Sequence, residues 1–510
     1  IALNGVTLAR VWSVSDTAGQ PDDSRLTGEE GISMESREYG TIDELVSDIG
    51  GSIHIERDKV VVQDANTVRS RLIDRLVWSA VFGDDDVKAA SRWLIRAIAQ
   101  ELGAWPASIH DLYMAAGRRE YANVTTPAIN VRTMTYDMAR EIFGAMHATE
   151  SRQVIFELAR SEMGYTDQRP GEYASAILGA AIKSGYAGPI FIQGDHYQAN
   201  AKDYASDPEG EIGSVRDLAI EAIHAGYGNI DVDASTLVDL DRDSLAEQQR
   251  DNYEQTAALT QAIREHEPEG ITVSIGGEIG EVGKQNSTVE ELEAFMAGYQ
   301  AEMERLSKAA GRELAGISKI SVQTGTSHGG VVLADGTIAD VSVDFDTLAK
   351  LSAEAKDRYG IGGAVQHGAS TLPEEAFGKF AEADAVEVHL ATGFQNILYD
   401  HEAFPSDLTE RMHAWLAENR ASERKPDMTD AQFYYTTRKR AFGPFKRDIW
   451  SLPDDVKGAI GADLRERFEL IMRLLGVAGR GDLVDRFVER VDFPLEPAPD
   501  ALTSALAKQA

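Results

Sequence analysis

The 510-residue chain contains no cysteine, and this absence removes several chemistries at once. Without cysteine there is no disulfide bond, no thiolate nucleophile and no cysteine-ligated zinc site. Any metal ion would therefore have to be bound by histidine, aspartate or glutamate.

Long apolar runs and an excess of positive charge are also missing. No stretch approaches the roughly eighteen consecutive apolar residues of a transmembrane helix, and no basic segment followed by an apolar run resembles a signal peptide. The 84 Asp and Glu residues outnumber the 50 Lys and Arg residues, which gives a net charge of −34. Such a surface repels nucleic acid phosphates and anionic lipids. We therefore expect a cytoplasmic protein that binds neither nucleic acids nor membranes.

Eight short apolar runs alternate with longer amphipathic stretches, as parallel strands alternate with helices. The runs are residues 128–131, 154–158, 190–194, 229–232, 272–275, 320–323, 363–366 and 385–388. Eight such units in about 270 residues fit an α/β fold of the (β/α)₈ TIM-barrel type. An open doubly wound sheet is the alternative, but the first run lacks the glycine-rich phosphate loop that usually follows it in that fold.

The segments on either side of the predicted barrel lack its alternation of apolar runs and amphipathic stretches. Residues 1–110 contain two strand-like runs and, from residue 66 onward, helical periodicity, so we expect a small α/β N-terminal extension. Residues 401–510 are charged and helical in pattern, so we expect a helical C-terminal extension. The barrel itself is then predicted over residues 111–400.

Three histidines follow predicted strands at the end where TIM barrels carry their active sites. His196 follows the third strand, His328 the sixth and His367 the seventh, each beside small Gly or Ser residues. Three neutral imidazoles at one barrel mouth can bind a zinc-type ion and leave a position open for water or substrate. A single strand-end histidine is more often a hydrogen-bonded structural residue, so the prediction depends on the three together.

Acidic and hydroxyl side chains occur at the same level of the barrel. Asp195 directly precedes the first of these histidines, and Asp233 and Ser235 end the fourth strand. Glu278 and Glu281 lie where the fifth strand runs into a glycine-rich loop, and a carboxylate on such a loop can act as a proton acceptor. With 84 acids in the chain, any one of them alone could be an ordinary solvated charge.

Six motifs lie in order on the successive predicted strands. They are Pro127-Ala128-Ile129-Asn130-Val131, Asp195-His196, Asp231-Val232-Asp233-Ala234-Ser235, residues 273–280, Ser327-His328-Gly329 and His367-Gly368-Ala369-Ser370. Together, over about residues 110–400, they resemble the class II (metal-dependent) fructose-bisphosphate and tagatose-bisphosphate aldolases.

The resemblance implies that a carbon–carbon bond of a ketose is made or broken through a metal-stabilised enediolate. The three histidines would bind Zn²⁺ or another divalent ion, and a monovalent cation is a further option. Asp195 would exchange the proton at the hydroxyl group beside that bond. Glu281, or less favourably Glu278, would take the proton from the α-carbon of the donor. Asp233 and Ser235 would support the metal-binding residues from behind.

The substrate-binding part of the resemblance is less complete. Gly329, Gly368 and Ser370 would offer N–H and hydroxyl donors to a phosphate or another anionic group. In the eighth strand, where the family usually has an Asn-x-Asp-Thr-Asp run, this chain has His389 in place of the asparagine and retains Thr392. We place both among the substrate-binding candidates. Since the metal-binding motifs are kept while this run is changed, the metal site is better supported than fructose bisphosphate as the substrate.

A basic cluster after the barrel stands out against the acidic background. It consists of Arg438-Lys439-Arg440 and Lys446-Arg447, with aromatic residues and glycine nearby. One interpretation is a solvated helix end whose cations pair with neighbouring acids. The other is a segment that reaches over a barrel mouth, its own or that of a neighbouring subunit, so that Arg438 and Lys446 bind phosphate.

Two functions of different classes remain open. The first is a zinc-dependent, class II aldolase-like lyase that acts on a ketose or ketose phosphate and, as is common in the family, forms a homo-oligomer. The second is a non-catalytic barrel that serves as a scaffold or stabilising subunit. The retained metal-binding motifs favour the enzyme, because a scaffold has no physical need for a set of converging ligands. The altered eighth strand favours the scaffold or a changed substrate.

Overall fold

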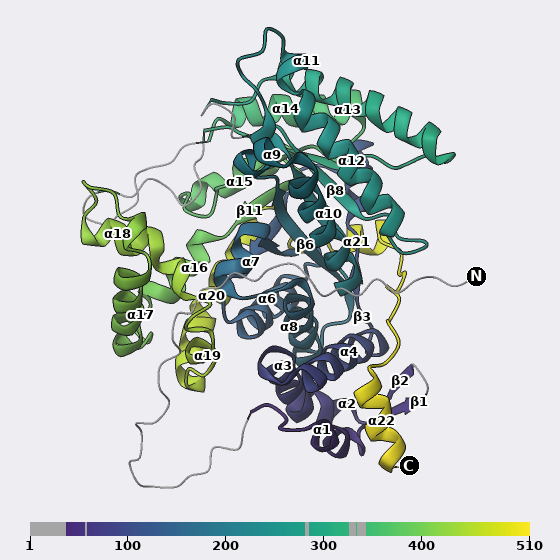
Figure 1. The fold of residues 1–510 in the computed structure, drawn as a ribbon, viewed down its shortest axis with the longest axis vertical. Helices are drawn as coiled ribbons and strands as arrows, with labels where there is room; N and C mark the ends of the chain where they lie inside the picture. The colour runs from purple at the N-terminus through teal and green to yellow at the C-terminus, as the bar shows by residue number, and fades with distance from the viewer. Residues whose placement is uncertain (1–36, 57–58, 281–284, 326–332, 334–342, 510) are drawn as a thin grey trace. The chain divides into compact units, whose positions relative to one another are not determined.

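Eight parallel strands close into a barrel in the computed structural model of the protein (Figure 1). The structure describes residues 37–56, 59–280, 285–325, 333 and 343–509. The barrel strands are β4 (Thr126–Asn130), β5 (Ile155–Ala159), β6 (Gly188–Gln198), β7 (Asn229–Asp233), β8 (Ser274–Glu278), β9 (Lys319–Val322), β10 (Ala364–Gln366) and β11 (Glu387–Leu390). Each strand pairs in parallel with the next, and β11 pairs back with β4. The predicted TIM barrel is therefore confirmed.

Helices connect the strands and surround the barrel, as the amphipathic stretches predicted. They are α6 (Thr135–Thr149), α7 (Arg160–Thr166), α8 (Pro170–Ser184), α9 (Ala201–Ser206), α10 (Pro208–Ala225), the 3₁₀ helix η2 (Ser235–Leu237), α11 (Leu245–Gln248), α12 (Arg250–His266), α13 (Val289–Ala310), α14 (Phe345–Tyr359), α15 (Glu374–Glu382) and α16 (Thr392–Asp400). Local signals set their ends. In α10, for example, the Asp207 side chain accepts the N–H of Gly210, Pro208 occupies the first turn, and Gly226 ends the helix at a φ of 99°.

The part of the chain before the barrel contains a strand that helical periodicity did not predict. Its elements are α1 (Ile42–Ile49), β1 (Ile53–Glu56), β2 (Lys59–Val62), α2 (Ala65–Thr67), the π-helical turn η1 (Val68–Leu72), α3 (Ile73–Phe82), α4 (Asp85–Glu101), β3 (Ala104–Ala107) and α5 (His110–Gly117). β1 and β2 form an antiparallel pair, whereas β3 pairs with the first residues of β6, below the point where β6 meets β7. A four-residue strand is too short to interrupt a helical pattern visibly, so sequence reasoning missed it.

The part after the barrel is helical, as expected. Its elements are α17 (Ser406–Asn419), η3 (Ala421–Glu423), α18 (Asp430–Thr437), η4 (Arg438–Ala441), α19 (Lys446–Trp450), α20 (Asp454–Leu474), α21 (Gly481–Phe487) and α22 (Asp500–Gln509). α20 packs against α6 of the barrel, and α22 packs against α1 and α4 (Figure 1). Domain boundaries at residues 110 and 400 stay a prediction.

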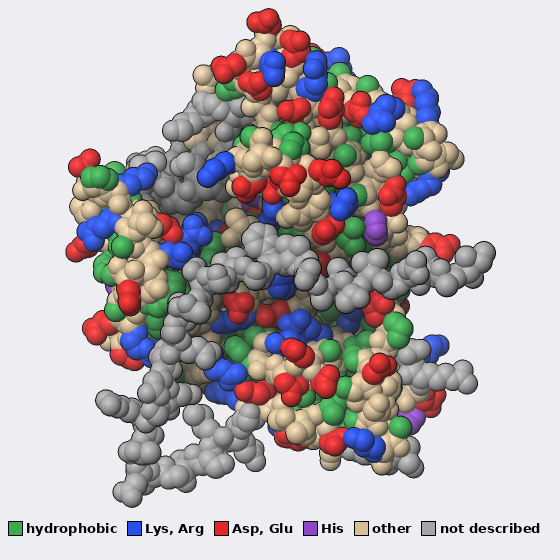
Figure 2. Space-filling view, viewed as in Figure 1, with side chains coloured by type: hydrophobic (Ala, Val, Ile, Leu, Met, Phe, Trp, Pro, Cys, Tyr) green, Lys and Arg blue, Asp and Glu red, His purple; other side chains and the backbone are tan. Residues whose placement is uncertain are grey.

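Two features of the surface bear on function. In the described ranges, no helix is both long and apolar enough to span a bilayer. Acidic and basic side chains are interspersed over the face drawn in Figure 2, with no single basic patch dominating it.

Candidate active site

A cavity of about 510 Å³ opens at the carboxyl ends of the barrel strands, where TIM-barrel enzymes carry their active sites. It is lined by Asn130, Arg132, Glu157, Ala159, Arg160, Ser161, Glu162, Asp195, His196, Gln198, Asn200, Asp203, His367, Gly368, Ser370, His389, Ala391, Thr392 and Lys439. Most of the described residues that sequence reasoning selected are on this wall. The C-terminal helical part also contributes to the wall, through Lys439.

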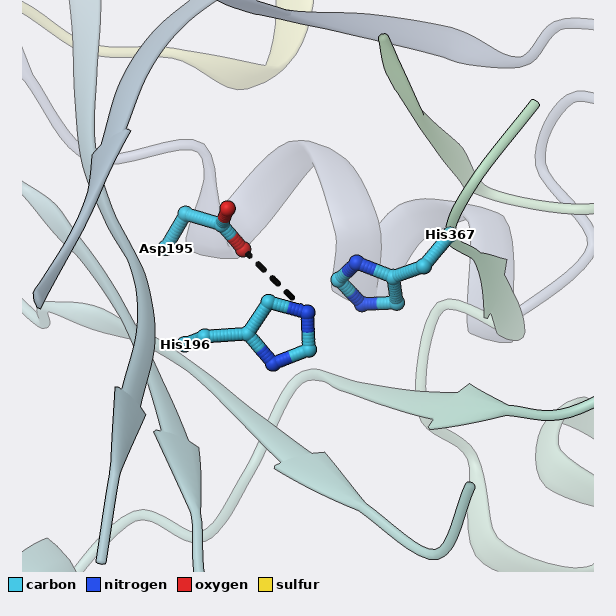
Figure 3. Close-up of side chains that lie close together, drawn as sticks. All are labelled: Asp195, His196 and His367. Atoms are coloured by element: carbon cyan, nitrogen blue, oxygen red, sulfur yellow. Dashed lines mark ion pairs between the residues drawn. The ribbon is translucent and has the colours of Figure 1, made fainter. Parts of the chain in front are cut away.

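Asp195, His196 and His367 converge inside this cavity (Figure 3). Each offers one potential ligand atom, and the three atoms lie within 4.8 Å of one another. The ring centroids of His196 and His367 are 4.1 Å apart, and Asp195 Oδ1 lies 3.9 Å from His196 Nε2. Two imidazoles and a carboxylate form a donor set that suits Zn²⁺ and related divalent ions. The residues present therefore fit the metal that the sequence predicts.

An irregularity in β6 brings two consecutive residues to the same cavity. Side chains of neighbouring strand residues normally point to opposite faces. The pairing of β6 with β7 shifts register between Gly194 and Tyr197, and His196 has a left-handed φ of 40°. Such a local break re-aims side chains, and here both Asp195 and His196 line the cavity. A positive φ at a non-glycine residue is costly, and such strain is concentrated at functional sites.

Asp233 holds the His196 ring from behind. Its Oδ2 lies 3.0 Å from His196 Nδ1 and accepts a hydrogen bond from the Gln198 amide at 2.6 Å. Its Oδ1 accepts the N–H and the hydroxyl of Ser235 at 3.0 and 2.7 Å. Burial opposes ionisation of Asp233, but these hydrogen bonds outweigh it and lower the pKa of the carboxyl. A carboxylate behind a metal-binding imidazole fixes its orientation and tautomer, which is the role predicted for Asp233 and Ser235.

Glu278, at the end of β8, lies between the two imidazoles. Its Oε2 is 3.5 Å from His196 Nδ1 and 3.7 Å from His367 Nε2. Ser321 of β9 adds a hydroxyl 3.1 Å from His367 Nε2. Glu278 also forms a second group of possible metal ligands with His196 and Asp233. It can thus act either as a ligand or as a base.

Negative charge exceeds positive charge around these histidines. Burial alone would lower the pKa of His196, but Asp195, Asp233 and Glu278 raise it well above its ordinary value. An excess of carboxylates stabilises a protonated histidine, and it stabilises a bound divalent cation for the same electrostatic reason. A metal ion that binds here would displace the proton from the imidazole.

His389 lines the cavity and is almost fully buried. Only 5% of it is exposed, and its ring centroid is 3.9 Å from that of His367. Its Nδ1 is 3.0 Å from Glu157 Oε2 and 3.2 Å from Asp195 Oδ1, and its Nε2 is 2.6 Å from Glu387 Oε1. His389 is therefore on the floor of the cavity and connects Asp195 to acids inside the barrel.

Below this floor the barrel interior contains a network of charged side chains. Lys319 is fully buried, and its Nζ lies 2.6 Å from Glu387 Oε1, 2.8 Å from Asp231 Oδ1 and 2.8 Å from Gln193 Oε1. The Tyr113 hydroxyl donates to the other oxygen of Glu387 at 2.5 Å. Burial raises the pKa of Asp231 to about 6, although Lys319 opposes the shift. This network replaces the branched apolar side chains that usually fill such barrels.

The remaining predicted residues divide into three groups. Gly368, Ser370 and Thr392 line the cavity, as expected of substrate-binding candidates. His328, Gly329 and Glu281 lie outside the described residues. The third group, Arg438 and Lys446, does not line the cavity.

Both of these cations are bound by acids elsewhere. Arg438 Nη1 lies 2.7 Å from Asp400 Oδ1. Lys446 Nζ lies 2.5 Å from Glu172 Oε1. These contacts match the interpretation of the basic cluster as cations paired with nearby acids, and a phosphate-binding role for the two stays a prediction.

Several residues of the site were missed by sequence reasoning. They are Arg132, Glu157, Arg160, Glu162, Lys319 and Glu387. Lys439 belongs to the basic cluster for which one interpretation was a segment that reaches over a barrel mouth, and it does line the cavity. A signal existed for Glu157 and Glu387, because each is a charge within an otherwise apolar buried strand. No comparable signal existed for Arg132 and Arg160, because the fold alone brings their segments to the cavity.

Comparison with known proteins identifies the class. A family model described as "Fructose-bisphosphate aldolase class-II" matches residues 107–433. The chain therefore belongs to the class II fructose-bisphosphate aldolase family, whose members are generally metal-dependent. A search of curated proteins found no match.

Among solved structures, the YdjI aldolase of Escherichia coli K12 is 14% identical, with a TM-score of 0.40 over 74% of this chain and 99% of that one. The fructose-bisphosphate aldolase of Campylobacter jejuni is 17% identical, with a TM-score of 0.41 over 72% and 93%. The fructuronate-tagaturonate epimerase UxaE of Cohnella laeviribosi is 13% identical, with a TM-score of 0.46 over 70% and 82%.

Proposed function

We propose that the protein is a zinc-dependent aldolase that makes or breaks a carbon–carbon bond of a ketose, with a ketose phosphate as the expected substrate. The observation that carries the proposal is the convergence of Asp195, His196 and His367 in one cavity at the barrel mouth. The family membership supports it independently. A homo-oligomer and a cytoplasmic location belong to the same proposal.

The described residues suggest how the work is divided. His196 and His367, with His328 as the predicted third ligand, would hold a divalent ion, and this ion would supply Lewis-acid polarisation of the substrate carbonyl. Asp233 keeps the His196 ring in place. Asp195 is the best-placed proton donor and acceptor for the hydroxyl beside the reacting bond, because it lines the cavity next to the imidazoles.

A proton acceptor for the α-carbon is also required. Glu278 lies close to both imidazoles and can take this role if Glu281, the first candidate, does not. The cavity of about 510 Å³ is within the range of small-molecule sites.

The test is a cleavage assay on the purified protein with a panel of ketoses and ketose phosphates. We expect aldehyde release that a chelator abolishes and added Zn²⁺ restores. Asp195→Ala should lower kcat by about 100-fold or more, the range lost with a general acid–base group. Asp241→Asn changes an exposed acid outside the cavity and should leave kcat unchanged. Cleavage that persists without metal would contradict the zinc dependence. A metal-loaded protein that cleaves nothing on the panel would contradict the proposal and favour the scaffold.

A further inference from the structure

Among the residues that the structure describes, three cations line the active-site cavity, and two of them are already paired with acids. Arg132 Nη2 lies 2.6 Å from Glu162 Oε1, and Arg160 Nη1 lies 2.6 Å from Glu211 Oε1. Lys439, the third, forms no ion pair with any acid among the residues that the structure describes. In a chain with a net charge of −34, a partly buried cation without a carboxylate partner is notable.

Glu162, an acid that also lines the cavity, is fully engaged by other donors. Glu162 accepts hydrogen bonds from Arg132 at 2.7 Å, from the Asn130 amide at 2.6 Å and from the Tyr165 hydroxyl at 3.1 Å. It also accepts the backbone N–H of Ala159 at 3.1 Å. These donors occupy both carboxylate oxygens of Glu162. The Lys439 ammonium can therefore bind another anion.

Burial lowers the pKa of the Lys439 ammonium, and the neighbouring Arg132 lowers it further, against smaller opposing effects of Glu162 and Glu423. Both effects mean that the positive charge is unfavourable where it stands. An anion in the cavity would relieve this cost, since it would supply the missing counter-charge in a partly desolvated place.

The fold fixes Lys439 at the cavity through contacts on either side of it. Before it, Arg438 is bound to Asp400. After it, the N–H of Gly443 donates to the backbone oxygen of Tyr165 in α7 at 2.9 Å. A Cβ at position 443 would come within 2.8 Å of that oxygen, so only glycine permits this close approach. The Lys439 Nζ itself lies 5.8 Å from the centre of the Tyr165 ring.

We infer that Lys439 is a specificity-determining residue that binds an anionic terminal group of the substrate while the reacting part of the same molecule lies at Asp195, His196 and His367. The inference rests on the proposed function, because it assumes that one substrate occupies the whole cavity. A phosphate and a carboxylate share the required charge, and the experiment must separate them.

The test compares Lys439→Met and Lys439→Arg with Arg440→Met in the Zn²⁺-loaded protein. Arg440 is the matched control, because it is on the same 3₁₀ helix and contacts the same Tyr165 ring, at 5.1 Å, but does not line the cavity. Inorganic phosphate and glycerate serve as probes, and calorimetry gives their dissociation constants.

We expect Lys439→Met to weaken at least one probe by about tenfold or more, the effect of losing one charge-assisted hydrogen bond. Lys439→Arg should retain most of the affinity, and Arg440→Met should match the wild type. Weakening of phosphate alone assigns the site to a phosphate group, and weakening of glycerate alone assigns it to a carboxylate. Unchanged affinity for both probes in Lys439→Met, or an equal loss in Arg440→Met, would overturn the inference.

Kinetics separate this inference from the proposed function. For an anionic ketose that is cleaved, Lys439→Met should raise KM by about tenfold and leave kcat nearly unchanged, while an uncharged ketose is unaffected. Cleavage with an unchanged KM in Lys439→Met would remove the inference and leave the proposed function intact. If the binding of phosphate or glycerate depends on Lys439 but the protein cleaves no ketose, the anion site at Lys439 stands and the proposed function is contradicted.

Discussion

Replacing Lys319 by methionine tests whether charge pairing inside the barrel holds the floor of the active site. Methionine retains most of the side-chain length and removes only the ammonium group. Lys319 is fully buried between Glu387 and Asp231, with N···O distances of 2.6 and 2.8 Å. After the replacement His389 is the remaining cationic partner of Glu387, at 2.6 Å from its Oε1.

The expected cost follows from this burial. Removing one partner of a buried ion pair destabilises a protein by about 3–5 kcal/mol, because the other charge is left in the interior. The exposed Lys308–Glu304 pair, with a lysine side chain 73% exposed, is the matched control. Lys308→Met should cost less than about 1 kcal/mol, as exposed ion pairs usually do.

The pH dependence sharpens the test. Lys319 is the cation that most strongly opposes the effect of burial on the pKa values of Asp231 and Glu387, and its removal should therefore raise both. Burial has already raised the pKa of Asp231 to about 6. A raised carboxyl pKa favours the folded state at low pH and loses that effect as the pH rises through the folded value. The deficit of Lys319→Met should therefore be largest near pH 8 and shrink towards pH 5.

The assay is urea unfolding followed by tryptophan fluorescence at these two pH values. Adding Asp231→Asn to Lys319→Met should recover part of the lost stability, because it removes one of the stranded charges. A loss below about 1 kcal/mol, or an equal loss at both pH values, would refute the reasoning about this network.

Two further predictions concern single side chains. Asp233→Asn should weaken Zn²⁺ binding by about 10- to 100-fold while the fold persists, because it changes the carboxylate behind a metal-binding imidazole. The control Asp241→Asn should bind Zn²⁺ as the wild type does. Equal zinc affinities of the two variants by equilibrium dialysis would contradict this prediction. Burial, aided by Arg264, lowers the pKa of His110 to about 4 from 6.5, so stability should be present above pH 6.5 and fall by at most about 3 kcal/mol as the pH drops towards 4. His110→Leu should flatten that part of the stability–pH curve, and a variant with the wild-type slope would show that His110 does not cause it.

The barrel could be predicted from the sequence because its signal is local and repeated. Each buried parallel strand appears as a short apolar run, and all eight runs overlap the observed strands. The sequence did not predict β3, because four residues within a helical region are too few to show the alternation of a strand. Its pairing with β6 also depends on a distant segment.

The candidate site was only partly visible for a related reason. Asp195 and His196 are adjacent in sequence, and the general rule for barrel ends places them at the mouth. Their convergence with His367 depends on the irregularity of β6, which the sequence does not announce. Lys439 lines the cavity because its segment, distant in sequence from the barrel strands, contacts α7 through the hydrogen bond from the Gly443 N–H. Contacts made across such sequence separations are set by tertiary packing rather than by local pattern.

Zinc binding by the wild type and three single histidine variants tests the central claim most directly. His196→Ala and His367→Ala each remove a proposed ligand, whereas His54→Ala changes a largely exposed histidine of β1. Equilibrium dialysis with elemental analysis should find about one Zn²⁺ per chain in the wild type and in His54→Ala, and far weaker binding in the other two. If the wild type binds no zinc, or if His196→Ala and His367→Ala bind it as the wild type does, the metal site proposed here is wrong.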